Sequence, residues 1–251
     1  MASPAPTATP ILTQVPSKAS RAAVLEHAAN ELVFAVVGHV GSGTSTVAEA
    51  LRGLLQAPGR AGGSYDVEIL KARTVIQNWA QSTGHQLPQT ETRQLEAVEG
   101  FQNLGDEMRK ISGDYAAVAK GLIGDIRRTR AERTGVADPG EAPVRPDGKK
   151  RAYILDSIRH PAEVDLLRHI YQDAFVLIGV VCEEERRLSR VMKKYENAGE
   201  AKAKRFMQRD AKAMERYGQR VSDAFHLSDF FLDNTVERLE RSGAENPNWD
   251  I

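Results

Sequence analysis

The residues with the clearest chemical pattern lie at positions 38–46, where the chain reads Gly-His-Val-Gly-Ser-Gly-Thr-Ser-Thr. Gly38, Gly43 and Ser45 give this segment the spacing G-x-x-x-x-G-x-[ST], which is typical of a loop that wraps phosphate groups. Glycines allow a tight turn with the backbone N–H groups directed inward, and a following helix adds the positive end of its dipole. The hydroxyl at the last position is placed to bind Mg²⁺ beside terminal phosphates. The pattern therefore predicts a phosphate-binding loop, or P-loop.

Thr44 departs from this pattern, because a P-loop normally carries a lysine there that neutralises charge on the β- and γ-phosphates. Threonine keeps a hydroxyl but no charge, so we expect backbone binding of phosphate to survive better than fast phosphoryl transfer. The alternative interpretation is a glycine-rich turn without a ligand, which the flanking strand and helix disfavour. The residues expected to bind a nucleoside triphosphate, ATP or a deoxynucleotide, are Gly38, Gly41, Ser42, Gly43, Thr44, Ser45 and Thr46.

Three side chains outside the loop are candidates for catalysis. Asp156 ends the apolar run at residues 153–155, and an aspartate in that position of a P-loop protein approaches Mg²⁺. Ser45 and Asp156 are therefore the expected metal ligands, although Asp156 could instead cap a helix. Arg159 follows at the carboxyl end of the same expected strand, where it could bind phosphate or lie in solvent. Arg187 belongs to a highly charged helix that is either a mobile lid over phosphates or a solvated surface.

The elements that must position these residues alternate between strand and helix. Residues 32–37 are a continuous apolar run, typical of a strand buried on both faces of a parallel sheet, and residues 44–55 follow as an amphipathic helix. This alternation predicts an α/β fold, namely a three-layer, doubly wound parallel sheet of the P-loop NTPase, nucleotide-kinase-like kind. The other expected strands cover residues 65–70, 151–155, 174–181 and 230–232; the other expected helices cover residues 20–31, 94–130 with a break near 112–113, 161–171, 183–217 and a segment after 232.

Composition restricts the partners and the location of the protein. Lys+Arg and Asp+Glu both number 34, so there is no overall basic field to attract nucleic acid or an anionic membrane. The single cysteine, Cys182, lies in an apolar run where we expect a buried, inert thiol. One cysteine excludes a disulfide framework and a cysteine-based zinc site within the chain, which fits a cytoplasmic location. No apolar run approaches the length of a membrane span. We expect a tail at residues 1–20, a nucleotide-binding domain at 21–240, and a tail or linker at 241–251.

Several motifs together resemble a known protein family. They are Gly41 to Ser45, Ile158 to Pro161, and the stretch from Gly218-Gln219 to Asn234. They are similar to the N-terminal P-loop, nucleoside-monophosphate-kinase-like domain of bacterial antiphage deoxycytidylate (dCTP/dCMP) deaminases, over residues 31–240. The resemblance implies a role in antiviral defence, in which the domain binds a nucleotide and regulates a C-terminal or separate deaminase domain. This chain lacks the His-x-Glu and Pro-Cys-x-x-Cys motifs of that zinc domain and cannot deaminate by its mechanism.

Three functions are therefore consistent with the sequence. The first is a nucleotide-binding regulatory domain that uses Mg²⁺, and the missing P-loop lysine favours this one. The second is an active nucleoside monophosphate kinase, in which Arg109 would grip the acceptor phosphate by paired hydrogen bonds, unless it is a surface arginine of its helix. The third is a protein-interaction module that has lost its ligand. The sequence leaves the preferred base and the oligomeric state open.

Overall fold

The computed structural model describes residues 30–58, 64–89, 94–137, 140, 143–195, 198–211, 213–214 and 216–236. The expected tails at residues 1–20 and 241–251, nearly all of the expected helix at 20–31 and the expected helix after the last strand lie outside these residues. The domain boundaries derived from the sequence therefore stay predictions.

The described residues form one five-stranded sheet in which every pair of neighbouring strands is parallel, in the order β2-β3-β1-β4-β5. The strand β1 lies at the centre, and its apolar sequence is buried against helices on both faces, as the sequence pattern predicts. The α/β, doubly wound fold class with the kinase-like arrangement is confirmed. The strands are β1 (Glu31–Val37), β2 (Asp66–Lys71), β3 (Arg151–Asp156), β4 (Phe175–Val181) and β5 (Phe230–Asp233).

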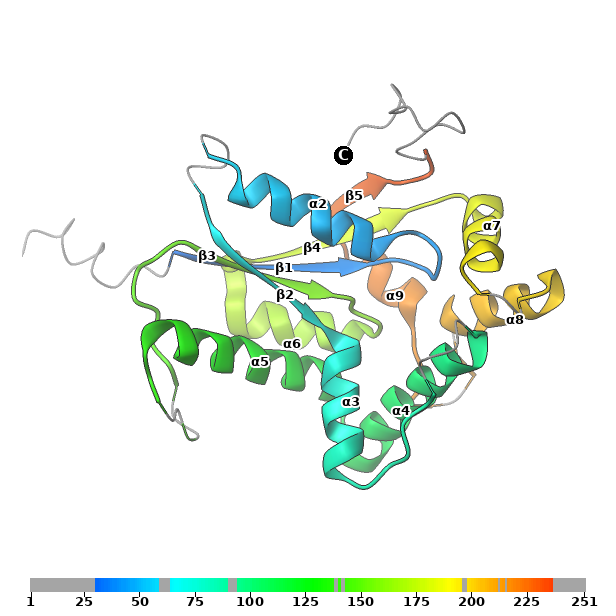
Figure 1. Cartoon of the computed structure of the whole chain (residues 1–251), viewed down its shortest axis with the longest axis horizontal. Helices are drawn as coiled ribbons and strands as arrows, with labels where there is room; N and C mark the ends of the chain where they lie inside the picture. The colour runs from blue at the N-terminus through cyan, green and yellow to red at the C-terminus, as the bar shows by residue number, and fades with distance from the viewer. Residues whose placement is uncertain are drawn as a thin grey trace, which may run out of the picture.

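Helices cover both faces of the sheet and its carboxyl edge. Figure 1 shows α2 on one face and α5 and α6 on the other, while α7 and α8 lie beyond the arrowheads of the strands. The helices are α2 (Thr44–Gln56), α3 (Ala72–Ser82), α4 (Leu95–Ser112), α5 (Ala117–Thr134), α6 (Pro161–Tyr171), α7 (Glu184–Lys194), α8 (Glu200–Ala211) and α9 (Val221–Phe225), with a 3-10 turn η1 (Gln172–Ala174).

Two expected helical stretches are divided in the structure. The break expected near residues 112–113 is present, because Gly113 adopts a positive φ of 65° and ends α4. The expected helix at 183–217 is wrong as a single element, since α7 ends at Lys194 and α8 ends at Ala211. Charge periodicity continues through this region, and it gave no sign of where the helix stops. The sequence analysis also missed α3 and α9.

Three apolar clusters hold these layers together. One joins the β1 side chains Val33, Ala35 and Val37 to α3, α4, α5, α6 and α9. A second lies on the opposite face, where Val36 packs with the buried side of α2. The third contains buried residues of α7 and α8 together with Leu95 at the start of α4. The helix pair at the carboxyl edge is therefore packed through its own small core.

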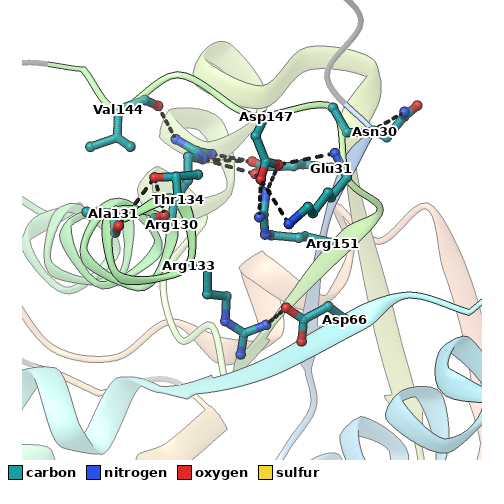
Figure 2. Close-up of polar contacts among 12 residues, drawn as sticks. Asn30, Glu31, Asp66, Arg130, Ala131, Arg133, Thr134, Val144, Asp147 and Arg151 are labelled. Carbon is teal, nitrogen blue, oxygen red and sulfur yellow. Dashed lines mark hydrogen bonds and ion pairs between the residues drawn. The ribbon is translucent and has the colours of Figure 1, made fainter. Parts of the chain in front are cut away.

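A cluster of paired charges closes the opposite end of the sheet, where β1 and β3 begin (Figure 2). The Arg130 guanidinium donates to the Glu31 carboxylate with an Nη2–Oε2 distance of 2.6 Å. Arg151 donates from Nη2 to Asp147 Oδ2 at 2.8 Å, and its Nη1 lies 3.5 Å from Glu31 Oε1. The hydrogen bond from Arg151 holds the pKa of Asp147 well below its usual range. Because Arg151 and Glu31 are buried, these charges need each other as partners.

This pairing yields a stability prediction. Replacing Glu31 with Ala leaves the largely buried Arg130 without its carboxylate, which costs about 3–5 kcal/mol for a buried pair. The matched control is Glu49→Ala, which removes an exposed partner of Arg52 and should cost less than about 1 kcal/mol. Urea unfolding followed by circular dichroism measures both values. Equal losses for the two variants would show that the cluster does not stabilise the sheet.

Candidate functional site

The predicted phosphate loop connects the end of β1 to the start of α2. Gly41 and Gly43 have φ values of 84° and 88°, a region of backbone conformation that side chains rarely adopt. Gly43 is the N-cap of α2, without a side-chain cap, and the first turn of the helix carries no acidic residue. The Thr46 N–H donates to the Gly43 carbonyl oxygen at 2.9 Å. The N–H groups of Thr44 and Ser45, in contrast, have no acceptor among the described residues and, with the positive end of the helix dipole, are available to an anion.

The glycines also allow neighbouring segments to approach the loop. A Cβ at Gly41 would lie 2.7 Å from the carbonyl oxygen of Arg187 in α7. A Cβ at Gly43 would lie 2.3 Å from Nδ2 of Asn234, which donates a 2.8 Å hydrogen bond to the Ser42 carbonyl. The loop is thus clamped between α7 and the segment that follows β5. Asn234 ends one of the stretches that carry the family resemblance, but its local sequence does not predict a contact with the loop.

Ser45 and Asp156 meet at the mouth of the loop. The strands β1 and β3 are parallel neighbours, with Val36 opposite Asp156, so the end of β3 lies beside the loop. Ser45 Oγ donates to Asp156 Oδ2 at 2.7 Å. A hydroxyl and a carboxylate side by side are the oxygen ligands that Mg²⁺ uses together with phosphates and water. The two predicted metal ligands are therefore adjacent, and their types fit the ion.

Both side chains line a cavity of about 420 Å³ at the carboxyl edge of the sheet. Its described lining comes from the loop, from α3 and α4, and from α7 and α8. Of the predicted phosphate-binding residues, Gly38 and Ser42 lie outside the lining; a Cβ at Gly38 would lie 2.5 Å from Ser42 Oγ, so both belong to the packing of the loop. The lining carries the cationic side chains Arg73, Arg159, Arg190 and Lys194 and the carboxylates Asp156 and Asp210.

The two arginines predicted for catalysis have different positions. Arg159 lines the cavity, and its Nη1 donates to Oδ1 of Asp210 in α8 at 2.7 Å, so its charge is already paired. Arg187 is not among the described residues that line the cavity, and its Nε donates to the carbonyl oxygen of Cys182 at 3.2 Å. Cys182 is half-buried, which raises the pKa of its thiol.

Arg190 and Lys194 are in a better position than Arg187 to supply positive charge. Arg190 Nη1 lies 3.5 Å from the Gly41 carbonyl oxygen and 3.3 Å from the Cys182 sulfur, and the Lys194 amine lies 5.6 Å from the ring centre of Tyr195. Neither forms an ion pair with any residue that the structure describes. Their spacing of four residues places them on one face of α7, a signal that the sequence already contained.

His39 adds no such charge to the loop. Its Nε2 lies 3.0 Å from Ser222 Oγ, and its ring packs 5.6 Å from that of Phe225. Burial, followed by the repulsion of the Arg187 guanidinium, lowers the pKa of His39 below its ordinary value. The imidazole is therefore neutral near pH 7, and compensation for the missing lysine must come from the arginines and the lysine around the cavity.

Arg109 is buried and does not line the cavity, which corrects both the expected contact with an acceptor phosphate and the alternative of a surface arginine. Its side chain is buried, and Nη2 donates to Oε1 of Glu163 at 2.9 Å. Glu163 Oε2 in turn accepts from the backbone N–H groups of Arg159 at 2.8 Å and His160 at 3.1 Å. The buried pair thus shapes the turn after β3 and helps to orient Asp156 and Arg159 toward the cavity.

The phosphate loop after the central strand, the order of the sheet and the cavity at its carboxyl edge together define a kinase-like P-loop fold. No protein-family model matches the chain. Within the described ranges, no helix has the length and apolar character needed to cross a bilayer.

This chain is similar to a curated protein and to several solved structures. The sequence is 27% identical over 203 residues to a UPF0200/UPF0201 protein of Archaeoglobus fulgidus; the match covers 81% of this chain and 50% of that protein. The chain therefore spans about half the length of this curated relative. Among solved structures, an uncharacterized protein from Eubacterium ventriosum has a TM-score of 0.40 at 12% identity, covering 80% of this chain and 87% of that one. A shikimate kinase from Acinetobacter baumannii has a TM-score of 0.38 at 13% identity, with coverages of 80% and 82%.

The packing of the loop predicts the effect of adding one methyl group. Gly43→Ala forces a side chain into a positive φ and against Asn234, so we expect the free energy of unfolding to fall by about 1–3 kcal/mol. Gly53→Ala, in the open middle of α2, has no atom within 4 Å of its new Cβ and should stabilise the protein by about 0.5–1 kcal/mol. Thermal and urea unfolding compare the two. A stable Gly43→Ala protein would contradict the described loop.

Proposed function

We propose that this chain binds a nucleoside triphosphate, ATP or a deoxynucleotide, together with Mg²⁺ in the cavity at the carboxyl edge of the sheet. The single observation that carries the proposal is the contact between Ser45 and Asp156 beside the uncapped start of α2, inside that cavity. The backbone N–H groups of the loop, above all those of Thr44 and Ser45 at the start of α2, would hold the phosphates. Ser45 and Asp156 would hold Mg²⁺, which when bound neutralises charge on the terminal phosphates.

The cations of α7 support this proposal because they compensate for Thr44. A P-loop lysine places one positive charge next to the phosphates, and Arg190 and Lys194 bring two charges to the same cavity from α7. Arg190 already reaches the backbone of the loop at Gly41. Since α7 packs with α8 through a small core, Arg190 and Lys194 belong to one packed unit beside the loop.

Titration calorimetry with ATP and dCTP, each with Mg²⁺, tests the proposal. We expect saturable binding that is weakened by Ser45→Ala. The double change Arg190→Ala with Lys194→Ala should weaken binding by at least about tenfold, because a hydrogen bond to a charged group contributes about 1.5–3 kcal/mol. Lys193→Ala is the matched control, since this exposed neighbour lies outside the cavity lining. No saturable binding to the unmodified chain would refute the proposal.

We further propose that the bound nucleotide has a regulatory role. Thr44 favours binding over turnover, since it removes a charge that stabilises the transferred phosphoryl group. The resemblance to the N-terminal domains of antiphage deoxycytidylate deaminases supports a role in antiviral defence inside the cytoplasm. In that role the nucleotide would control a deaminase domain carried on a longer chain or on a separate partner, because this chain has no deaminase motif.

A kinase is the second candidate, and one observation favours it. The cavity extends from the loop to the wall formed by α3 and α4, where the Arg73 guanidinium lies 4.1 Å from the ring centre of Phe101. Arg73 forms no ion pair among the described residues, so its charge is available to an acceptor phosphate. An acceptor oxygen would attack the terminal phosphorus while the bond to the bridging oxygen breaks, which leaves a nucleoside diphosphate.

The kinase candidate predicts product formation from ATP and at least one deoxynucleoside monophosphate. Arg73→Ala should lower kcat/KM by at least about tenfold through loss of the acceptor contact, and Thr44→Lys should raise kcat by restoring the loop charge. Chromatographic separation of mono-, di- and triphosphates measures both effects. A chain that binds ATP but forms no diphosphate product with any monophosphate would eliminate the kinase and leave the binding proposal standing.

A further inference from the structure

A carboxylate from α8 occupies donors of the phosphate loop. Asp210 is 1% exposed, although carboxylates are rarely buried without strong partners. Its Oδ2 accepts the backbone N–H of Val40 in the loop at 2.7 Å, and its Oδ1 accepts Nη1 of Arg159 at 2.7 Å. The Gln102 amide of α4 lies 3.4 Å from the same Oδ1. The side chain is therefore held from three separate elements.

These donors are the kind that bind phosphate oxygens. A backbone N–H of a phosphate loop and a guanidinium both bind oxyanions strongly, and both groups lie in the cavity that contains Ser45 and Asp156. An aspartate carboxylate is itself an oxyanion with two acceptor atoms. Asp210 therefore stands where two oxygens of a bound phosphate group could stand, and it carries a like charge.

The position of Val40 within the loop suggests which phosphate competes with Asp210. The N–H groups of Thr44 and Ser45 lie at the start of α2. The Val40 N–H and the Arg159 guanidinium, in contrast, both donate to the carboxylate of Asp210 in α8. Phosphates bound at the helix start can leave the Asp210 contacts intact. A further phosphate that extends toward Arg159 meets the carboxylate and must displace it.

We infer that Asp210 is a specificity-determining residue that makes the site distinguish triphosphates from diphosphates. The inference rests on the proposed nucleotide binding and adds a response to the terminal phosphate. A diphosphate binds with the carboxylate in place, while a triphosphate displaces it from Val40 and Arg159. Displacement releases α8, whose residues Phe206 and Met207 pack in the small core shared with α7. The position of the α7–α8 pair therefore depends on the number of phosphates on the bound nucleotide.

Calorimetry with Mg²⁺-ADP and with the Mg²⁺ complex of a hydrolysis-resistant ATP analogue tests this inference. Asp210→Asn keeps an acceptor oxygen but removes the charge. We expect it to tighten binding of the ATP analogue by at least about tenfold, because a like charge close to the phosphate is lost. Binding of ADP should change by less than about threefold. Asp165→Asn, an exposed residue of α6, removes a charge elsewhere and should change neither affinity.

Hydrogen exchange on the unmodified chain gives an independent measurement if Asp210→Asn does not fold. Backbone exchange of residues 200–211 should be faster with the ATP analogue than with ADP. Equal exchange with both nucleotides would overturn the inference, and so would weaker analogue binding by Asp210→Asn, which would mean that Asp210 only orients Arg159. If both nucleotides bind and these results fail, nucleotide binding stands without the discrimination. If neither nucleotide binds the unmodified chain, both proposals fall.

Discussion

The parallel pairing of β1 with β3 is the interaction on which the arrangement of the site depends. These two strands are parallel, with Val36 opposite Asp156, so both strands end at the same edge of the sheet. One then turns into the phosphate loop and the other into the turn that carries Arg159. The contact between Ser45 and Asp156 follows from this register. A shift by one residue would turn the Asp156 side chain to the other face of the sheet.

The two ends of the sheet differ in their balance of positive and negative side chains. At the amino end, Arg130 and Arg151 are matched by Glu31 and Asp147, so the cluster closes the core without excess charge. At the carboxyl end, the described residues that line the cavity include four cationic side chains and two carboxylates. Of these cations, only Arg159 has a carboxylate partner among the described residues. The surplus lies where a phosphate chain would bring negative charge, which fits the anion-binding character of the loop.

Local patterns in the sequence predicted the fold and the loop, whereas long-range pairing decided the roles of the arginines. The apolar run before Gly38 and the glycine spacing act within a few residues, so they could be interpreted directly. The role of Arg109 was predicted wrongly because its partner, Glu163, lies 54 residues away. Helical periodicity relates residues only a few positions apart and does not indicate such a partner. The partner of Arg159, Asp210, is 51 residues away on a separate helix, α8, which begins directly after Gly199.

The hydrogen bond from Asn234 to the Ser42 carbonyl joins residues 192 positions apart and gives the loop its second support. Contacts between residues so distant in sequence form late, because the chain between them must first be ordered. The phosphate loop is built near the beginning of the described chain, but it is braced only when β5 is in place. During synthesis, a ribosome-bound chain would therefore display the loop sequence long before it could use the site. A fragment that stopped before residue 234 would keep the sequence motif and lose its mechanical support.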